Sequence, residues 1–502
     1  MIKKKHTVLL VSVSIIALFI IWGLLPGNIA GKFSLERTMS AGNSFLLEKF
    51  GWFYSLLMTS IVILAIYFSV SKYGKIRLGK DEDRPEFGYV TWLSMLFAAG
   101  MGIGLVFYGI SEPIAHMDSP LTDGQSEADK MRFAMRYSFL NWGIHPWAIY
   151  AIAAMIIAYF TFRKGKSGTI SSTVTPLFKT SSSSVIGRIV DILSVLAIVF
   201  GVIPTIGIGA QQIAGGLSYL IPSIHNTTGF QVILIGVFTV VFLLSAQTGI
   251  KRGIKYLSNF NIMLAALLLF FVLFAGPTLF ILDFFTTSLG KYIQTLPEMS
   301  LKLNPLNHDE SSYIRSWTIF YWGWWISWTP FVANFIARIS KGRTIREFIS
   351  GVVLVPALIG TFWFAVFGGT SLHLDMFSGG NIASEIASNG PEVGLFALLG
   401  QLPFAQITQA LGVVLVAAFF ITSADSATYV VAMQTSNGSL NPSNRLKLSW
   451  GIIISALSMI LLGAGGLDAL QTTALVGAFP FAFVIVLMIA SFMREIKKEK
   501  ID

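Results

Sequence analysis

Residues 8–25 read VLLVSVSIIALFIIWGLL, an apolar run without a charged residue. Similar apolar runs occur at 260–275, 412–421 and 474–491. Hydrophobic residues make up 54% of the 502-residue chain and charged residues only 12%, whereas soluble proteins carry roughly 25% charged residues. A helix needs roughly 20 mostly apolar residues to cross the hydrocarbon of a bilayer. The sequence therefore predicts an all-α integral membrane protein.

The chain is expected to cross the membrane about twelve times. Residues 8–25 resemble a cleavable signal in part, but no small-residue cleavage site follows them, so they are interpreted as the first span. The full set of predicted spans is 8–25, 51–70, 91–110, 138–162, 185–210, 228–246, 257–282, 317–336, 351–369, 407–430, 450–464 and 471–492.

The formal net charge of +10 is explained by membrane topology rather than by nucleic-acid binding. Most of the 35 Lys and Arg residues fall in alternate segments between the predicted spans, which is the positive-inside pattern. This pattern predicts a multi-pass protein of the cell membrane with both termini in the cytoplasm. Because the chain has no cysteine, disulfides, thiolate nucleophiles and cysteine metal sites are excluded.

Two predicted spans contain residues that interrupt helices. One includes AAGMGIG at 98–104, and the other includes GWWISWTP at 323–330. Tight helix packing is one explanation for the glycines. However, each segment opens a block of about five spans, at 91–282 and 317–492. Because each block has an odd number of spans, the two blocks must cross the bilayer in opposite orientations. Paired breaks in inverted repeats are a sequence pointer to a transporter site at mid-membrane.

The remaining divisions of the chain follow from these two blocks. Residues 1–90 would supply two N-terminal helices and a cytoplasmic loop, residues 283–316 an external connecting segment, and residues 493–502 a short cytoplasmic tail. Such a short charged tail offers little surface for contacts with lipid or neighbouring subunits. We therefore expect at most modest activation by osmotic upshift.

Aromatic residues cluster within two of the predicted spans. Trp142, Trp147 and Tyr150 fall within one arc of a helix, and a second arc holds Phe320, Trp324, Trp325 and Trp328. Interfacial belts account for many membrane Trp and Tyr residues. Alternatively, ring faces that converge on one point form a cage for a cation that donates no hydrogen bonds, such as a trimethylammonium group.

Three segments resemble the betaine/choline/carnitine transporter family: FYGISEP at 107–113, residues 142–150 and residues 321–346. The resemblance covers nearly the whole chain, and WWISWTPF at 324–331 with ARISKGR at 337–343 is its most specific part. It implies a leucine-transporter-like fold, in which two extra N-terminal helices precede two inverted five-helix repeats, and a homotrimer. It also implies a substrate cage of Trp142, Trp147, Tyr150 and Trp325, with Trp324 and Trp328 lining the path.

The glycine segment separates subtypes within that family. Residues 100–104, GMGIG, are similar to the sodium-coupled glycine betaine carriers, whereas proton-coupled choline carriers tend to have Asp where this chain has Gly104. Choline is a net cation and gains from a carboxylate, but an acid at this position would repel the carboxylate of the zwitterion glycine betaine. Ectoine and proline carriers share the glycine form, so the segment does not identify the solute.

Sodium requires several oxygen ligands, and an unwound membrane helix supplies backbone carbonyls. Phe419, Thr422 and Ser423 share one helix face, which by spacing alone fits either an ion site or hydrogen bonding between helices. The family resemblance implies a sodium site and, less securely matched, a second one. The residues implied are Ala98, Met101, Phe419, Thr422 and Ser423 for the first site, and Thr205 and Phe331 for the second.

Other motifs carry little weight. GKS at 165–167 is similar to the end of a phosphate loop, but Phe160 stands where the first glycine belongs. No His-Glu-x-x-His or Gly-x-Ser-x-Gly occurs, so we expect neither an ATP-driven pump nor an enzyme. Asp425, an ionisable residue near a span, is interpreted as structural.

We therefore predict a symporter that imports glycine betaine or a related osmolyte by alternating access. Its partners would be a small quaternary-ammonium substrate, sodium as the coupling ion, and membrane lipid, with no cofactor and no nucleic acid. A proton-coupled choline carrier, a sodium-independent carnitine-type antiporter and a channel are the alternatives.

Overall fold

The protein is built from α-helices. The structure, a computed structural model, describes residues 7–25, 31–100, 102–248, 255–439 and 441–500. Its helices are α2 (Thr7–Leu24), α4 (Leu35–Val70), α5 (Tyr89–Gly100), α6 (Ile103–His116), α7 (Glu127–Trp142), α8 (Ile144–Ala158), α9 (Ser171–Val174), α10 (Val185–Leu220), α11 (Thr228–Thr248), α12 (Lys255–Ala275), α13 (Thr278–Leu301), α14 (His308–Ile314), α15 (Phe320–Ile339), α16 (Ile345–Phe377), α17 (Ile382–Asn389), α18 (Gly394–Gly400), α19 (Ala405–Thr435) and α20 (Asn444–Ile496).

Within the described residues, nine helical segments are long and apolar enough to cross a membrane. The other predicted spans also fall on helices. The pair α5–α6 is divided by the glycine segment, α15 is rich in Trp, and α20 contains two predicted spans. The two halves of α20 meet at Gly465 and Gly466, whose backbone angles are not helical. The all-α membrane fold predicted from the sequence is confirmed.

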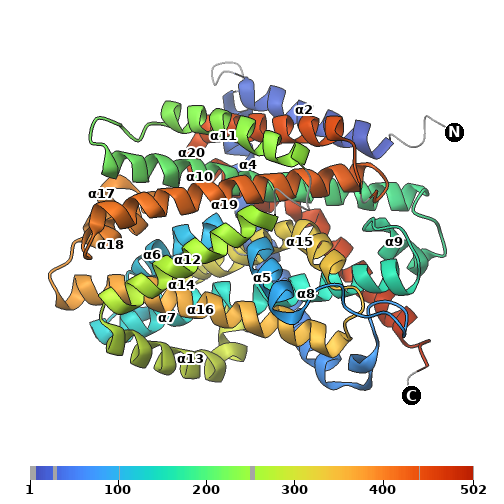
Figure 1. Cartoon of the computed structure of the whole chain (residues 1–502), viewed down its shortest axis with the longest axis horizontal. Helices are drawn as coiled ribbons and strands as arrows, with labels where there is room; N and C mark the ends of the chain where they lie inside the picture. The colour runs from blue at the N-terminus through green and yellow to red at the C-terminus, as the bar shows by residue number, and fades with distance from the viewer. Residues whose placement is uncertain (1–6, 26–30, 101, 249–254, 440, 501–502) are drawn as a thin grey trace.

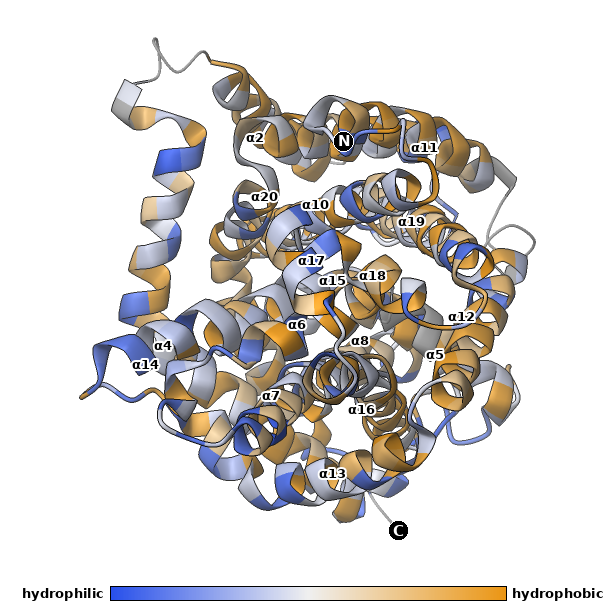
Figure 2. Ribbon diagram, turned by 90° about the vertical axis from the view of Figure 1, so that its left-hand side faces the viewer, coloured by the Kyte–Doolittle hydropathy of each residue, from blue (hydrophilic) through white to orange (hydrophobic). Residues whose placement is uncertain are grey.

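The outer helices present apolar side chains to their surroundings. On α11, Ile233, Val237, Val240 and Leu244 follow one another every three or four residues, and each is more than half exposed. Figure 2 shows hydrophobic residues along α11 and α12 as well. By contrast, every residue of α8 from His145 to Ala158 is buried. An exposed apolar face around a buried helix is the arrangement expected when lipid is the solvent.

Two groups of helices pack together. Helices α11, α19 and α20 pack on α10, and Figure 1 shows α10, α19 and α20 running side by side. Helices α4, α15 and α16 pack on α8. Because α15 also contacts α10 and α20, it joins the two groups at the centre of the molecule.

One of the two predicted helix interruptions is present and the other is not. Helix α5 ends at Gly100 and α6 begins at Ile103, with Gly102 between them in a non-helical conformation (φ −143°, ψ −141°). Helix α15, however, is continuous through Pro330, so the predicted interruption at 323–330 is wrong. Proline has no N–H to bond the carbonyl of Ile326 one turn earlier, and membrane helices tolerate such a gap where their surroundings re-satisfy the backbone. The inverted repeats and the division of the chain based on them stay predictions.

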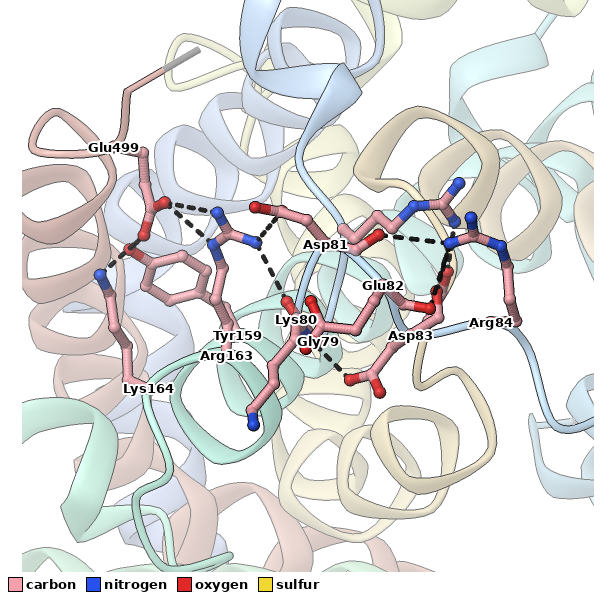
Figure 3. A network of polar contacts seen from close by, with 12 residues as sticks. Gly79, Lys80, Asp81, Glu82, Asp83, Arg84, Tyr159, Arg163, Lys164 and Glu499 are labelled. Carbon is pink, nitrogen blue, oxygen red and sulfur yellow. Dashed lines mark hydrogen bonds and ion pairs between the residues drawn. The ribbon is translucent and has the colours of Figure 1, made fainter. Parts of the chain in front are cut away.

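A polar network joins three segments that are far apart in the sequence (Figure 3). Glu499, which follows α20, pairs with Arg163 at 2.8 Å and with Lys164 at 2.7 Å. Tyr159 donates its hydroxyl to the same carboxylate at 2.9 Å. Arg163 in turn pairs with Asp81, which belongs to the loop before α5, at 2.7 Å. The network therefore ties the end of the chain and the loop before α5 to the segment that continues α8.

Candidate functional site

A helix break that the sequence did not predict positions the first aromatic group. Helix α7 ends at Trp142 and α8 starts at Ile144, so the expected single span at 138–162 is two helices. A Cβ atom on the intervening Gly143 would lie 2.4 Å from the Phe139 carbonyl oxygen and 2.9 Å from the Tyr292 hydroxyl. Only glycine fits there. The break places Trp142 at the end of one helix, and Trp147 and Tyr150 in the first two turns of the next.

The second aromatic group lies on α15. Trp324 and Trp325 stack almost parallel, with ring centroids 5.2 Å apart. Trp328 packs edge-on against Trp324 at 6.2 Å, and its Nε1 donates to the Gly201 carbonyl of α10 at 2.7 Å. This bond fixes one turn of α15 against α10.

The two aromatic groups meet, as the cage hypothesis requires. Trp325 contacts Trp142 edge-to-face at 5.0 Å and Tyr150 at 6.5 Å, and Trp147 contacts Tyr150 at 5.9 Å. These four residues form the aromatic cage, and each of them is at most 3% exposed. Trp324 lies beside the cage at 6.3 Å from Trp142. The structure therefore brings the predicted substrate residues of α7, α8 and α15 together.

Three polar atoms of the predicted substrate residues have no hydrogen-bond partner among the described residues. They are Trp147 Nε1, Tyr150 Oη and Trp324 Nε1, and all three are buried. Buried N–H and O–H groups normally find a partner, and each exception asks for an explanation. Donors left free beside an aromatic cage are available to a polar ligand.

Gly104 lies directly against the cage. A Cβ atom at this position would be 2.9 Å from Cη2 of Trp142 and 3.7 Å from Cη2 of Trp324. A larger residue would therefore push against a buried indole, and a carboxylate would reach the cage itself. The position of Gly104 gives a physical basis to the subtype argument made from the sequence.

The predicted sodium ligands lie only partly within the described residues. Met101 is outside them, as is the side chain of Ala98, whose backbone lies in the last turn of α5. On α19, Ser423 Oγ lies 3.1 Å from the position that a Cβ of Gly102 would take, so it faces the break between α5 and α6. Thr422 Oγ1 lies 3.1 Å from the Phe419 carbonyl oxygen. The Ser423 hydroxyl therefore lies next to the broken helix, whereas that of Thr422 bonds within α19.

The second predicted sodium pair is less well defined. Thr205 is buried on α10, and its hydroxyl has no partner among the described residues. Phe331 packs against Trp328 at 6.0 Å on α15. Because Trp328 is bonded to Gly201, one turn from Thr205, the two residues lie on neighbouring helices near one crossing. No bond joins Thr205 to Phe331 in the described part of the chain.

Sequence reasoning missed a buried carboxylate beside the cage. Glu112 is fully buried on α6, and its Oε2 accepts a hydrogen bond from Trp142 Nε1 at 2.7 Å. The predicted span ended at residue 110, which placed Glu112 in an external loop, but α6 continues through Pro113 to His116. An ionisable residue within a membrane helix is a functional candidate by default, so a longer span would have revealed it.

Two further polar contacts involve residues of α19. The Nδ2 of Asn261, on α12, donates to Thr422 Oγ1 at 2.9 Å, which places a third helix beside the predicted sodium ligands. Asp425, one turn further along α19, accepts a hydrogen bond from Ser245 at 3.0 Å. Neither contact assigns a function.

The helices and the buried cage define a multi-pass membrane protein with a central aromatic site. Comparison with known proteins identifies the class: the model of the betaine/carnitine/choline family transporters matches residues 7–501. The chain belongs to this family of transporters, and it is not an enzyme.

Individual relatives share nearly the full length. The chain is 47% identical to the glycine betaine transporter OpuD of Bacillus subtilis over 501 residues, which cover 100% of this chain and 96% of that one. It is 40% identical to a probable glycine betaine transporter of Desulfitobacterium hafniense, with 99% and 98% covered. It is 42% identical to an ectoine/hydroxyectoine transporter of Virgibacillus pantothenticus, with 90% of each chain covered.

Proposed function

We propose that this protein is a sodium-coupled symporter that imports glycine betaine, or a closely related osmolyte, across the cell membrane by alternating access. The single observation that carries the proposal is the convergence of Trp142, Trp147, Tyr150 and Trp325 next to Gly104. The names of the relatives that transport glycine betaine support the same substrate.

The cage supplies what a trimethylammonium group requires. Such a cation donates no hydrogen bonds, so it is held by the negative faces of aromatic rings, at roughly 0.5–2 kcal/mol for each ring. The rings lie in a buried site, where competition from water is small and the attraction is strongest. A simple alkyl group would gain only the apolar contact.

The free donors beside the cage suit the other end of glycine betaine. Trp147 Nε1, Tyr150 Oη and Trp324 Nε1 have no partners among the described residues, and a carboxylate accepts hydrogen bonds from such groups. Choline offers a single hydroxyl oxygen in place of a carboxylate and would leave at least one of the three donors unpaired. This asymmetry favours a zwitterion over choline.

Sodium coupling is supported by the oxygen atoms at the broken helix. The hydroxyl of Ser423 lies where α19 passes the break between α5 and α6, Thr422 precedes it on the same helix, and a broken helix exposes backbone carbonyls. We therefore propose Ala98, Met101, Phe419, Thr422 and Ser423 as ligands of the coupling ion. About two sodium ions for each neutral solute would make transport electrogenic, with Thr205 and Phe331 near the second ion.

The proposal includes three further points. Both termini would face the cytoplasm, as the positive-inside pattern predicts. The protein would be a homotrimer embedded in lipid, as the family resemblance implies. The solute would be concentrated during osmotic stress as an osmoprotectant.

Uptake by the purified protein in proteoliposomes tests the proposal. Radiolabelled betaine, choline, carnitine, ectoine and proline are compared under an inward sodium gradient and under potassium replacement. We expect saturable, uphill uptake of betaine that requires sodium. Undiminished uphill uptake without sodium would instead favour the proton-coupled or antiport alternatives, and flux without saturation would favour a channel.

A variant and a matched control test whether the coupling sodium ion binds at Ser423. Ser423→Ala removes a hydroxyl from the proposed site and should raise the sodium concentration for half-maximal uptake about tenfold. Thr428→Ala, which removes a buried hydroxyl of the same helix that is bonded to the Ala424 carbonyl, serves as the control. Equal effects of the two substitutions would move the ion site away from Ser423.

A further inference from the structure

Glu112 is the centre of a buried network that joins three helices. Its Oε1 accepts from Asn141 Nδ2 at 2.8 Å and lies 3.1 Å from Nε2 of His116. Its Oε2 accepts from Trp142 Nε1 at 2.7 Å and from the Tyr321 hydroxyl at 2.5 Å. One carboxylate thus binds side chains of α6, α7 and α15.

Most of the groups that contact the Glu112 carboxylate are neutral hydrogen-bond donors. Among the described residues, His116 is the only basic side chain within 4.0 Å of Glu112, and no Lys or Arg is that close. The side chain of Glu112 is fully buried, and burying a carboxylate is costly unless its oxygens are hydrogen-bonded. Four contacts on two oxygens meet that requirement. A costly group that is completely bonded in a membrane helix calls for a functional reason.

Two of the donors lead directly to the cage. Trp142, itself a cage residue, is bonded to Glu112 at its N–H edge, and its opposite edge reaches Gly104. Asn141 contacts both Glu112 and Trp325, because its Nδ2 donates to Glu112 and its backbone carbonyl accepts from Trp325 Nε1 at 2.9 Å. Glu112 therefore bonds Trp142 directly and reaches Trp325 through the end of α7.

The third donor supports the same two rings. Tyr321 stacks on Trp325 at 5.5 Å with an interplanar angle of 24°, and it contacts Trp142 edge-on at 5.6 Å. Its hydroxyl is fixed by Glu112. We propose that Glu112 is a positioning residue that holds Trp142 and Trp325 at the mutual angle that the cage requires.

A carboxylate is suited to this position because both of its oxygens accept. In Glu112→Gln, one oxygen becomes an NH₂ group that faces either the Trp142–Tyr321 pair or the Asn141–His116 pair. If the NH₂ group faces the Trp142–Tyr321 pair, the Trp142 N–H meets a second donor and the indole loses its anchor; if it faces the other pair, the Asn141 Nδ2 meets a second donor and the bond between α6 and Asn141 is lost. The substitution keeps the shape of the side chain, so its effect reports hydrogen bonding rather than volume.

The decisive test is whether Glu112 acts through the indole N–H of Trp142. Glycine betaine affinity is measured on the purified full-length protein for Glu112→Gln alone and in two backgrounds. Trp142→Phe keeps a ring but has no N–H, whereas Trp147→Phe is the matched control because Trp147 Nε1 has no partner in the described chain. We expect Glu112→Gln to weaken binding about tenfold in the wild type and in Trp147→Phe.

In the Trp142→Phe background the same substitution should weaken binding less than threefold. A full tenfold loss there would show that Glu112 does not act through Trp142 and would overturn the proposal. If Glu112→Gln does not fold, Trp142→Phe alone remains informative. It should lose several-fold in affinity with the ring retained, and unchanged affinity would overturn the proposal.

A readout without ligand separates this inference from the proposed function on which it rests. The ultraviolet resonance Raman band of the indole N–H is compared between wild type and Trp142→Phe, and again in the Glu112→Gln background. The difference spectrum between wild type and Trp142→Phe should contain the band of a strongly hydrogen-bonded indole. The same difference taken in the Glu112→Gln background should lack this band. If wild type binds no betaine but shows this signature, only the proposed function fails; if it binds betaine and the signature is absent, only the role of Glu112 fails.

Discussion

Glu112 and Glu499 are two well-bonded carboxylates in very different surroundings. Glu112 lies among aromatic rings, and its partners are the neutral side chains of Asn141, Trp142 and Tyr321 together with the imidazole of His116. Glu499 lies at the end of the chain and is paired with two cations, Arg163 and Lys164 (Figure 3).

The difference separates two uses of the same chemical group. Arg163 and Lys164 balance the charges of Glu499 and Asp81, so these bonds can tie segments together but add no net charge. The neutral donors around Glu112 are themselves parts of the cage or its support. One carboxylate therefore contacts the proposed binding site, and the other joins Tyr159, Arg163 and Lys164.

The largest effect should come from placing a second carboxylate directly against the cage. Gly104→Asp would put a Cβ 2.9 Å from Trp142 and a negative charge beside the cage, where it would repel the carboxylate of the proposed substrate. An unpaired buried charge costs roughly 3–5 kcal/mol, so glycine betaine affinity should fall on the order of 100-fold or more. Binding of labelled betaine to the purified variant measures this.

Gly104→Ala is the control, because it adds the Cβ without the charge. We expect it to lose clearly less affinity than the aspartate variant. If both substitutions weaken betaine equally, the contact with Trp142 alone would explain the glycine, and charge would have no part in selecting the substrate.

The features of this site that depend on residues close together in the sequence could be predicted, whereas those that depend on residues far apart in the sequence could not. Helix-spaced aromatic residues show which residues can share a face, and the predicted rings are in contact, whereas their role in binding stays a prediction. The break at Gly143 was missed because the residue that packs against it, Tyr292, is distant in sequence: its hydroxyl accepts from the Ile144 N–H at 3.2 Å, and such a tertiary contact is not visible in local sequence.

The opposite error occurred on α15. The segment at 323–330 suggested an interruption, but α15 continues through Pro330, as membrane helices can. Glu112 was missed because the predicted span ended at residue 110, whereas α6 continues through Pro113 to His116. In both cases the helix in the structure extends through a proline.

A smaller effect is expected from removing one ring of the cage. Trp325→Leu removes a cation–π contact and local packing worth roughly 1–2 kcal/mol or more, so betaine affinity should fall at least about tenfold. Trp325→Phe keeps an aromatic face and should lose distinctly less. Both affinities are measured on purified, monodisperse protein.

The matched control is Trp22→Leu, since Trp22 lies on α2, outside the cage. It should leave betaine affinity unchanged. If leucine and phenylalanine at position 325 weaken binding equally, the pocket is merely hydrophobic. If Trp325→Leu binds betaine as tightly as wild type, the quaternary-ammonium assignment loses its basis and a differently shaped osmolyte becomes the better candidate.

The smallest effect should come from Glu499. Burial alone would raise the pKa of its carboxyl, but hydrogen bonds from Arg163, Lys164 and Tyr159 outweigh it and lower the pKa to about 2. A lowered pKa means that the carboxylate stabilises the fold above its ordinary pKa of 4.5, and that this stabilisation is lost as the pH falls toward 2. Between pH 5 and pH 8, roughly, its contribution should therefore be constant.

Glu499→Gln should lower the melting temperature by only about 1–2 °C, because partly exposed ion pairs contribute little and the chain is long. The deficit should be the same at each pH across that range and should shrink in acid, where the wild type loses its charge as well. Betaine affinity should not change, in contrast to Glu112→Gln. Thermal unfolding in detergent at several pH values, with betaine binding measured beside it, checks both parts. A tenfold loss of affinity in Glu499→Gln would show that the polar network acts on the cage, and the separation between the two carboxylates would not hold.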